Sequence, residues 1–279
     1  MADRLRVGMY QFSPRLGDRE GNLAAIEAGL AGVEADLVVL PELATSGYAL
    51  PSREAAAAVA ESPGSAGLTR LQALAESLGA ALLLGLPLAE NGKLFNAAAL
   101  LRPAAPPVFY RKLHLFYREG EVFDPGDRPA PVEDVAGARV GVMICFDWVF
   151  PELARSLALA GAELLAHPSN LVLPGFAQAA MVTRAVENRV FAITCNRVGE
   201  ERYPDEERSL RFTGLSQALD PRGRPLLQFG ETDTRRGVVT LDLAEARDKR
   251  ITPRNHLFAD RRPEHYGPLT APLSDGRES

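Results

Sequence analysis

Cysteine is scarce in this chain of 279 residues, which contains only Cys145 and Cys195. Two cysteines cannot form the disulfide framework of a small secreted protein, so their number favours a reducing, cytoplasmic compartment. Long apolar runs are missing as well, and none approaches the roughly 20 residues that a membrane-spanning helix needs. No apolar signal-peptide core precedes the strand-like segment that begins at Leu5. We therefore expect a cytoplasmic protein without a membrane partner.

Positive charge is also in deficit. The formal net charge is −5 and the isoelectric point is about 5.5, so no basic surface argues for a nucleic-acid partner. The four histidines show no paired spacing of the kind that binds zinc. No glycine-rich phosphate-binding loop is present. We expect no metal and no cofactor.

Strand-like and helix-like patterns alternate through the chain, and 46% of the residues are hydrophobic. With no Ser/Gly-rich linker, this pattern favours one α/β domain over 1–279 in which helices cover two sheets. The last part, 247–279, is rich in Arg, Pro and His and predicts an irregular C-terminal tail. We expect strands at 5–11, 37–40, 81–86, 96–101, 108–112, 139–144, 163–166 and 190–196, helices at 19–33, 53–60, 68–78, 151–160 and 176–188, and a closing antiparallel portion at 215–219, 226–229 and 237–241.

Three of the expected strands lead into a side chain that can take part in catalysis. Ligands of open α/β sheets gather beyond the carboxyl ends of the strands, so these side chains are expected to converge. They are Glu42, which follows 37–40 after Pro41, Lys112 at the end of 108–112, and Cys145 after 139–144.

Each of the three has an ordinary explanation when it is taken alone. Glu42 would be a charge at a helix entry, Lys112 an edge residue and Cys145 a small core residue. Together they supply a base, a cation and a nucleophile. For Cys145 we also expect a lowered thiol pKa, because backbone N–H groups and a helix dipole stabilise a thiolate where a strand meets a helix. Cys195 ends a buried apolar run and is expected to stay in the core.

A Cys–His hydrolase is the competing arrangement, with Cys145 paired to His114 or His167. His114 follows Lys112 by two positions, so on a continued strand it would lie on the same side. We favour a histidine that supports the site by hydrogen bonding over a histidine that acts as the base.

Several short motifs follow one another in a fixed order. They are Pro41-Glu42-Leu43, Tyr110-Arg111-Lys112-Leu113-His114-Leu115, Phe123-Asp124-Pro125-Gly126-Asp127, Cys145-Phe146-Asp147-Trp148-Val149-Phe150-Pro151-Glu152, His167-Pro168-Ser169-Asn170 and Arg184-Ala185-Val186-Glu187-Asn188-Arg189. In these motifs and their spacing the chain resembles the nitrilase, or carbon–nitrogen hydrolase, superfamily, and most of all its small single-domain nitrilases and amidases. The resemblance runs from about Leu5 to the region near Tyr266. It implies a four-layer αββα sandwich, with two mixed sheets inside and helices outside.

The resemblance also implies a Glu-Lys-Cys triad. Glu42 would be the general base that takes the thiol proton, and Cys145 would attack the nitrile or carbonyl carbon. Lys112 and the backbone N–H of Phe146 would stabilise the developing negative charge. Ammonia would leave, and water activated by Glu42 would hydrolyse the thioester.

Many members of the family carry a second glutamate shortly after the lysine. Glu119 fits that pattern better than Glu121, and it would orient Lys112 or the incoming water. Trp148 is expected either to line the pocket or to pack under the following helix. Asn170 is expected to contact the substrate or to hold a loop. Together Phe146 and Trp148 make an apolar entrance, which suits a small aliphatic or aromatic substrate.

The family further implies a homodimer, in which the helix around 184–191 forms a two-fold interface and the tail crosses onto the partner. The expected activity is hydrolysis of a non-peptide C–N bond in a small nitrile or amide. An N-carbamoyl amide hydrolase is the alternative within enzymes. A redox-sensing or scaffolding protein, with a reactive but non-catalytic Cys145, is the alternative from another class.

Overall fold

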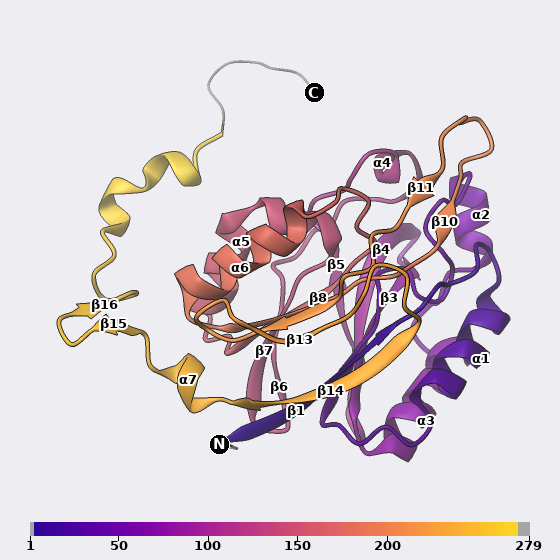
Figure 1. Ribbon diagram of the computed structural model, residues 1–279. Helices are drawn as coiled ribbons and strands as arrows, with labels where there is room; N and C mark the ends of the chain where they lie inside the picture. The colour runs from indigo at the N-terminus through magenta and orange to yellow at the C-terminus, as the bar shows by residue number, and fades with distance from the viewer. Residues whose placement is uncertain (1–2, 273–279) are drawn as a thin grey trace.

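Two six-stranded mixed sheets form the centre of the computed structural model, which describes residues 3–272 (Figure 1). The first sheet has the order β14-β1-β2-β3-β4-β5, and the second has the order β13-β12-β9-β8-β7-β6. The strands of the first sheet are β1 (Arg4–Gln11), β2 (Leu37–Val39), β3 (Ala81–Glu90), β4 (Lys93–Leu101), β5 (Val108–Arg111) and β14 (Arg235–Asp242). The strands of the second are β6 (Val132–Val135), β7 (Ala138–Val142), β8 (Leu164–Pro168), β9 (Phe191–Cys195), β12 (Gln217–Leu219) and β13 (Pro225–Gln228).

Helices cover the outer face of each sheet, so the predicted αββα sandwich is confirmed. Its physical basis is visible in β2, where Val39 packs into the core between the sheets and Val38 packs toward the helices. In β8, Leu164 likewise packs into the core between the sheets, and Leu165 packs toward the helices. Successive strand residues point to opposite faces, so a strand covered on both faces must be apolar throughout. The helices are α1 (Arg19–Leu30), α2 (Arg53–Ala58) and α3 (Ala66–Leu78) beside the first sheet, and α5 (Pro151–Leu159) and α6 (Phe176–Asn188) on the second.

The final strands differ from the expected closing portion. Strands β12 and β13 extend the second sheet, whereas β14 returns to pair antiparallel with β1 in the first sheet. The predicted antiparallel pairing is therefore divided between the two sheets. Strand β6 was not predicted, because its sequence Val132-Glu133-Asp134-Val135 is half polar.

The C-terminal segment is only partly irregular. It contains α7 (Ala244–Arg247), the hairpin of β15 (Arg250–Thr252) with β16 (Asn255–His256), and the 3₁₀ turns η2 (Pro263–His265) and η3 (Gly267–Leu269). This segment leaves the body of the molecule, as Figure 1 shows in yellow. Positions 273–279 of the predicted tail lie outside the described residues. Within residues 3–272, no helix has the length and apolar character needed to cross a membrane.

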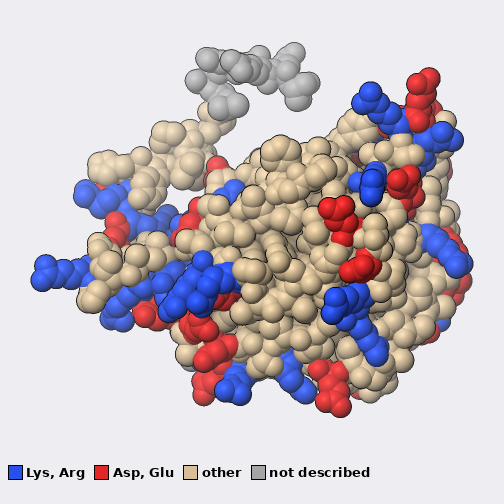
Figure 2. Space-filling view, viewed as in Figure 1, with Lys and Arg blue, Asp and Glu red and all other residues tan. Residues whose placement is uncertain are grey.

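Charged side chains of both signs are interspersed on the face shown in Figure 2, and much of its centre is uncharged. Shorter elements sit near the carboxyl ends of the central strands. They are α4 (Glu119–Val122), the 3₁₀ helix η1 (Cys145–Val149), and the pair β10 (Glu200–Glu201) and β11 (Leu210–Arg211).

Candidate active site

Cys145 occupies a strained turn between β7 and α5. It is the first residue of η1, and its φ of 39° lies in the left-handed region that a non-glycine residue rarely adopts. The residue is only 5% exposed. Its carbonyl oxygen lies 2.8 Å from Nε2 of His167. Strain of this kind persists only where the surroundings hold the backbone, and it is common at functional sites.

Asp147 ties this turn to the segment that carries Lys112. Its Oδ2 accepts hydrogen bonds from the backbone N–H of Ile144 and from the hydroxyl of Tyr110, both at 2.8 Å. Its Oδ1 lies 2.7 Å from Nδ1 of His114. One buried carboxylate therefore joins the second sheet to the end of the first, and fixes the turn that carries Cys145 relative to the segment that carries Lys112.

His114 and His167 lie near Cys145, but their imidazole nitrogens contact groups other than its thiol. His114 contacts Asp147 and stacks on Phe150 with ring centroids 3.6 Å apart. His167 holds the carbonyl of Cys145, and burial lowers the pKa of its imidazole, which keeps the ring neutral. Among the described residues neither imidazole hydrogen-bonds to the sulfur, so the geometry does not favour a Cys–His pair.

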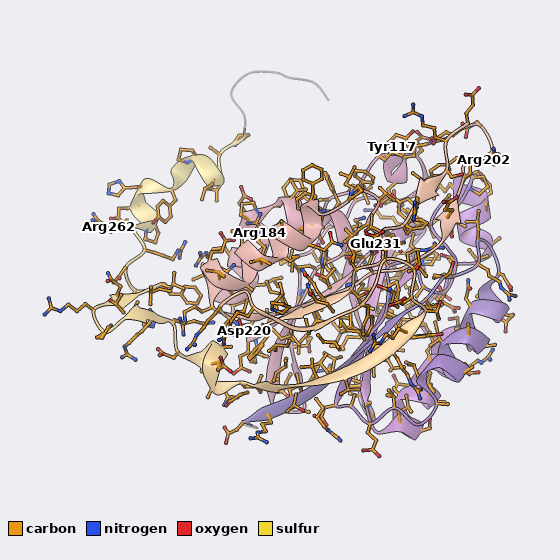
Figure 3. All side chains as sticks on the ribbon, viewed as in Figure 1. Tyr117, Arg184, Arg202, Asp220, Glu231 and Arg262 are labelled. Carbon is orange, nitrogen blue, oxygen red and sulfur yellow. The ribbon has the colours of Figure 1, made fainter. Side chains whose placement is uncertain are left out.

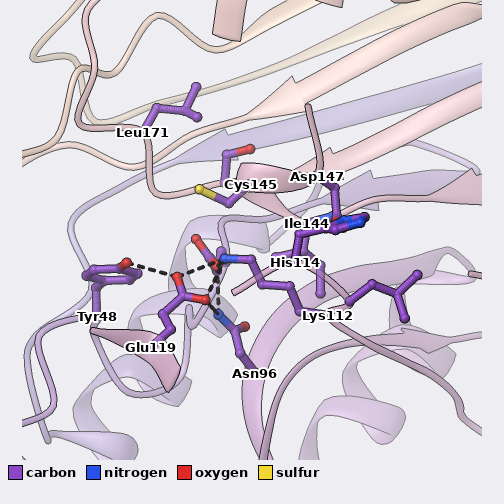
Figure 4. Close-up of polar contacts among 12 residues, drawn as sticks. Tyr48, Asn96, Lys112, His114, Glu119, Ile144, Cys145, Asp147 and Leu171 are labelled. Atoms are coloured by element: carbon purple, nitrogen blue, oxygen red, sulfur yellow. Dashed lines mark hydrogen bonds and ion pairs between the residues drawn. The ribbon is translucent and has the colours of Figure 1, made fainter. Parts of the chain in front are cut away.

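Lys112 and Glu119 lie close to Cys145 (Figure 4), and Glu42 joins them in one buried cluster through its contact with Lys112. The ammonium of Lys112 lies 2.7 Å from Oε1 of Glu42 and 2.8 Å from each carboxylate oxygen of Glu119. Glu42 follows β2, Lys112 follows β5, and Glu119 begins α4. Glu121 instead points to solvent, with its side chain 61% exposed and bonded to Arg118. Of these two glutamates, Glu119 therefore belongs to the buried cluster and Glu121 does not.

The two oxygens of Glu42 have different surroundings. Oε1 accepts from Lys112 and, at 2.7 Å, from the amide of Asn96. Oε2 is buried and has no hydrogen-bond partner within residues 3–272. One carboxylate oxygen therefore holds the cluster together and the other remains free to accept a proton.

Tyr48 and Asn96 also contact the cluster, and neither was predicted from the sequence. The hydroxyl of Tyr48 donates to Glu119 at 2.8 Å, and Asn96 contacts both Glu42 and Glu119. Asn96 had a signal in the sequence, because it is a lone amide in a buried apolar strand. Tyr48 had none beyond its position six residues after Glu42.

Burial and mutual charge set the ionisation of the cluster. Burial raises the pKa of Glu119 to about 7, against the opposing effect of the Lys112 ammonium. Burial disfavours the ammonium of Lys112, but the carboxylates of Glu119 and Glu42 outweigh it and raise the pKa of this lysine above its ordinary value. Lys112 therefore stays charged.

The thiol of Cys145 behaves differently from the prediction. Burial, followed by the negative charge of Glu42, raises the pKa of this thiol well above its ordinary value, although Lys112 and the backbone N–H of Asn170 act in the opposite direction. The expected lowering of the thiol pKa is therefore wrong. The backbone donors at the strand end do not compensate for the loss of water and for the nearby carboxylate.

A small pocket, partly open to solvent, lies beside the sulfur of Cys145. Phe146, Trp148 and Asn170 line it, as do Phe116 and the segment 171–173, which the sequence analysis did not identify. Trp148 also packs against the hydrophobic cores on both faces of the second sheet. No grouping of His, Cys, Asp and Glu side chains within the described residues could hold a metal ion.

Comparison with known proteins relates this arrangement to one family. A family model described as "Carbon-nitrogen hydrolase" matches residues 6–251. A "Nitrilase" from Pyrococcus abyssi is 40% identical over 94% of this chain and 99% of its own length. An "(R)-stereoselective amidase" from Pseudomonas sp. is 34% identical over 88% of each chain.

Solved structures agree. A variant of an amidase from Nesterenkonia sp. AN1, which carries the acetamide moiety of fluoroacetamide added covalently at its active-site cysteine, is 28% identical. Its TM-score is 0.75, and the match covers 93% of this chain and 94% of that one. A carbon–nitrogen hydrolase from Helicobacter pylori shares the fold, with a TM-score of 0.83, 23% identity and coverage of 96% and 98%. The chain therefore belongs to the carbon–nitrogen hydrolase family of the nitrilase superfamily and is a hydrolase of C–N bonds.

Proposed function

We propose that the protein hydrolyses a small amide or nitrile through a covalent thioester on Cys145, with release of ammonia. The observation that carries this proposal is the buried Oε2 of Glu42, which has no hydrogen-bond partner among the described residues. Burial also raises the pKa of the Cys145 thiol, which favours its protonated form. A protonated thiol is a weak nucleophile, so it needs a base at the moment of attack. Glu42 is a base with one unoccupied oxygen.

In this mechanism Glu42 takes the proton of Cys145 as the sulfur attacks the substrate carbon. The charge that develops on the substrate oxygen or nitrogen is stabilised by the Lys112 ammonium and the backbone N–H of Phe146. Loss of one such donor typically costs about 2.7–4 kcal/mol of transition-state stabilisation. For an amide, the proton held by Glu42 passes to the leaving nitrogen, and ammonia departs. Glu42 then removes a proton from the water that hydrolyses the thioester.

Glu119 is proposed to hold Lys112 in place. Its carboxylate contacts the ammonium through both oxygens and is itself held by Tyr48.

One relative is named a nitrilase and another an amidase. The proposal therefore includes both a nitrile and an amide as the group that is hydrolysed. An N-carbamoyl amide is the second candidate, since an N-carbamoylputrescine amidase from Solanum lycopersicum is 30% identical over 73% of each chain. A redox-sensing role is disfavoured by a physical argument. Sensor cysteines are accessible thiols of low pKa, whereas the Cys145 thiol is buried and its pKa is raised.

Ammonia release from a panel of nitriles, amides and N-carbamoyl compounds tests the proposal. Cys145→Ala is expected to abolish turnover while the circular dichroism spectrum stays unchanged. Cys195→Ala is the matched control, because Cys195 lies in the core and forms no part of the cluster. Turnover retained by Cys145→Ala, or ammonia release from no compound of the panel, would contradict the proposal.

We also propose that 1–279 forms one domain and that two copies associate through the outer face of α5 and α6. Exposed apolar side chains on these helices, Leu159, Phe176 and Val186, support the interface. The C-terminal segment leaves the body beside this face and could reach a partner copy (Figure 1). Light scattering of the purified protein measures the mass, and a monomeric mass would contradict the dimer.

The low cysteine number supports a cytoplasmic location.

A further inference from the structure

The wall of the pocket beside Cys145 is almost wholly apolar. Phe116 and Phe146 have ring centroids 5.1 Å apart, and Phe146 meets Phe150 edge-on at 5.7 Å. Phe146 therefore packs between two other rings on the aromatic side of the pocket. The aromatic side consists of Phe116, Phe146 and Trp148, and the aliphatic side consists of Leu171, Val172 and Leu173.

The remaining polar side chain of the wall, apart from the thiol, is uncharged. Asn170 is 2% exposed, and neither its amide nitrogen nor its amide oxygen has a hydrogen-bond partner among the described residues. A neutral amide can pair with a neutral donor or acceptor, but it cannot compensate an ionised group. The ammonium of Lys112 in the neighbouring cluster already forms ion pairs with the carboxylates of Glu42 and Glu119.

Arginines near the pocket are engaged elsewhere. Arg184 on α6 (Figure 3) donates to the carbonyl of Trp148 at 3.2 Å and pairs with Glu187 at 3.0 Å. Arg118 pairs with three carboxylates outside the pocket. Arg211 faces a separate hollow that shares only Val172 with the pocket. Within residues 3–272, no charged side chain lines the pocket wall.

We infer that the acyl group of the substrate is neutral and apolar, so that the enzyme acts on aliphatic or aromatic amides or nitriles without a carboxylate or an ammonium on the acyl chain. This inference rests on the proposed function and specifies its substrate class. An ionised substituent would leave water for an apolar wall without a counter-charge, and the loss of its hydration would oppose binding.

Three amides of similar chain length test the inference by turnover. Butyramide is neutral, succinamate carries a carboxylate, and 4-aminobutyramide carries an ammonium. We expect kcat/KM for butyramide to exceed both other values by about 100-fold or more, the effect of a buried charge without a partner. A kcat/KM for either charged amide equal to that of butyramide would overturn the inference, and would leave the proposed hydrolysis intact.

Alkylation of the thiol tests the same inference without turnover, so it decides even if no amide is hydrolysed. Iodoacetamide and iodoacetate differ in one group, a neutral amide against a carboxylate. In Cys195→Ala, where Cys145 is the only thiol, we expect the rate ratio of iodoacetamide to iodoacetate to exceed the ratio for glutathione by about 100-fold. A ratio equal to that of glutathione would overturn the inference.

A substitution at the pocket mouth provides the matched variant. Leu173 is 43% exposed, so a longer side chain fits there without disturbing the core. Leu173→Arg places a cation in the wall, where it can pair with the carboxylate of iodoacetate. The rate ratio of iodoacetamide to iodoacetate is therefore expected to fall at least about tenfold. Leu173→Met, of similar size and uncharged, is expected to keep the wild-type ratio. Equal ratios in Leu173→Arg and Leu173→Met would count against the wall as the source of the selectivity.

Discussion

A β-carbon added to Gly85 would lie 2.4 Å from the Cα of Glu42, closer than two such atoms approach in proteins. Gly85 lies within β3, and its N–H donates to the carbonyl of Pro41 at 2.9 Å. The chain that carries Glu42 therefore crosses directly over β3 at the one position without a side chain. Close packing against β3 therefore positions Glu42, the proposed base, within the buried cluster.

Gly85→Ala is expected to move Glu42 away from the cluster. A displacement of about 1 Å in a catalytic group typically costs about 100-fold in rate, so kcat should fall by that order while KM changes less. Overpacking should also lower the free energy of unfolding by about 1–3 kcal/mol. Steady-state kinetics and urea unfolding measure the two effects. A wild-type kcat in this variant would show that the position of Glu42 does not depend on β3.

Gly126 has the same relationship to the segment of Lys112. Its N–H donates to the carbonyl of Lys112 at 2.8 Å, and an added β-carbon would lie 2.2 Å from the carbonyl oxygen of Arg111. Gly126→Ala is therefore expected to displace the ammonium and to lower kcat by about 100-fold. Gly120→Ala is the control, because nothing lies within 4 Å of its added carbon. Equal activity of the two variants would contradict the prediction.

Removal of Asp147 should cost more stability than removal of any one of its partners. Tyr110→Phe deletes one hydrogen bond and leaves the carboxylate with two, so a loss of about 0.5–1.5 kcal/mol is expected. Asp147→Ala leaves the Ile144 N–H and the Tyr110 hydroxyl without an acceptor, and each buried orphan costs about 1–3 kcal/mol. Thermal unfolding of both variants measures the difference. The prediction fails if Tyr110→Phe is as destabilised as Asp147→Ala.

Sequence patterns predicted the layers well because burial on both faces leaves a direct trace, as in Leu37-Val38-Val39 of β2. They also placed Glu42, Lys112 and Cys145 beyond strand ends. Return of β14 to the first sheet, by contrast, depends on pairing between segments more than 200 residues apart, which no local pattern encodes.

The pKa of Cys145 was predicted in the wrong direction for a related reason. The local sequence shows the backbone donors at the end of a strand, but it does not show how much water the fold removes or which carboxylate it brings near. Tyr48 joins the cluster in the same way, through tertiary contact alone.

The raised thiol pKa predicts opposite effects of one substitution on turnover and on thiolate formation. Glu42→Gln removes the proposed base, so turnover should be lost. It also removes a negative charge that disfavours the thiolate, so the apparent pKa of Cys145 should fall and alkylation by iodoacetamide should begin at lower pH than in the wild type. Cys195, buried and with its pKa raised to about 12, should remain unlabelled over the same range and serves as the internal control. Mass spectrometry of the labelled peptides at each pH gives both profiles. If the alkylation profile of Glu42→Gln moved to higher pH, then Glu42 would be assisting thiolate formation at rest, and the assignment of a protonated resting thiol would be wrong.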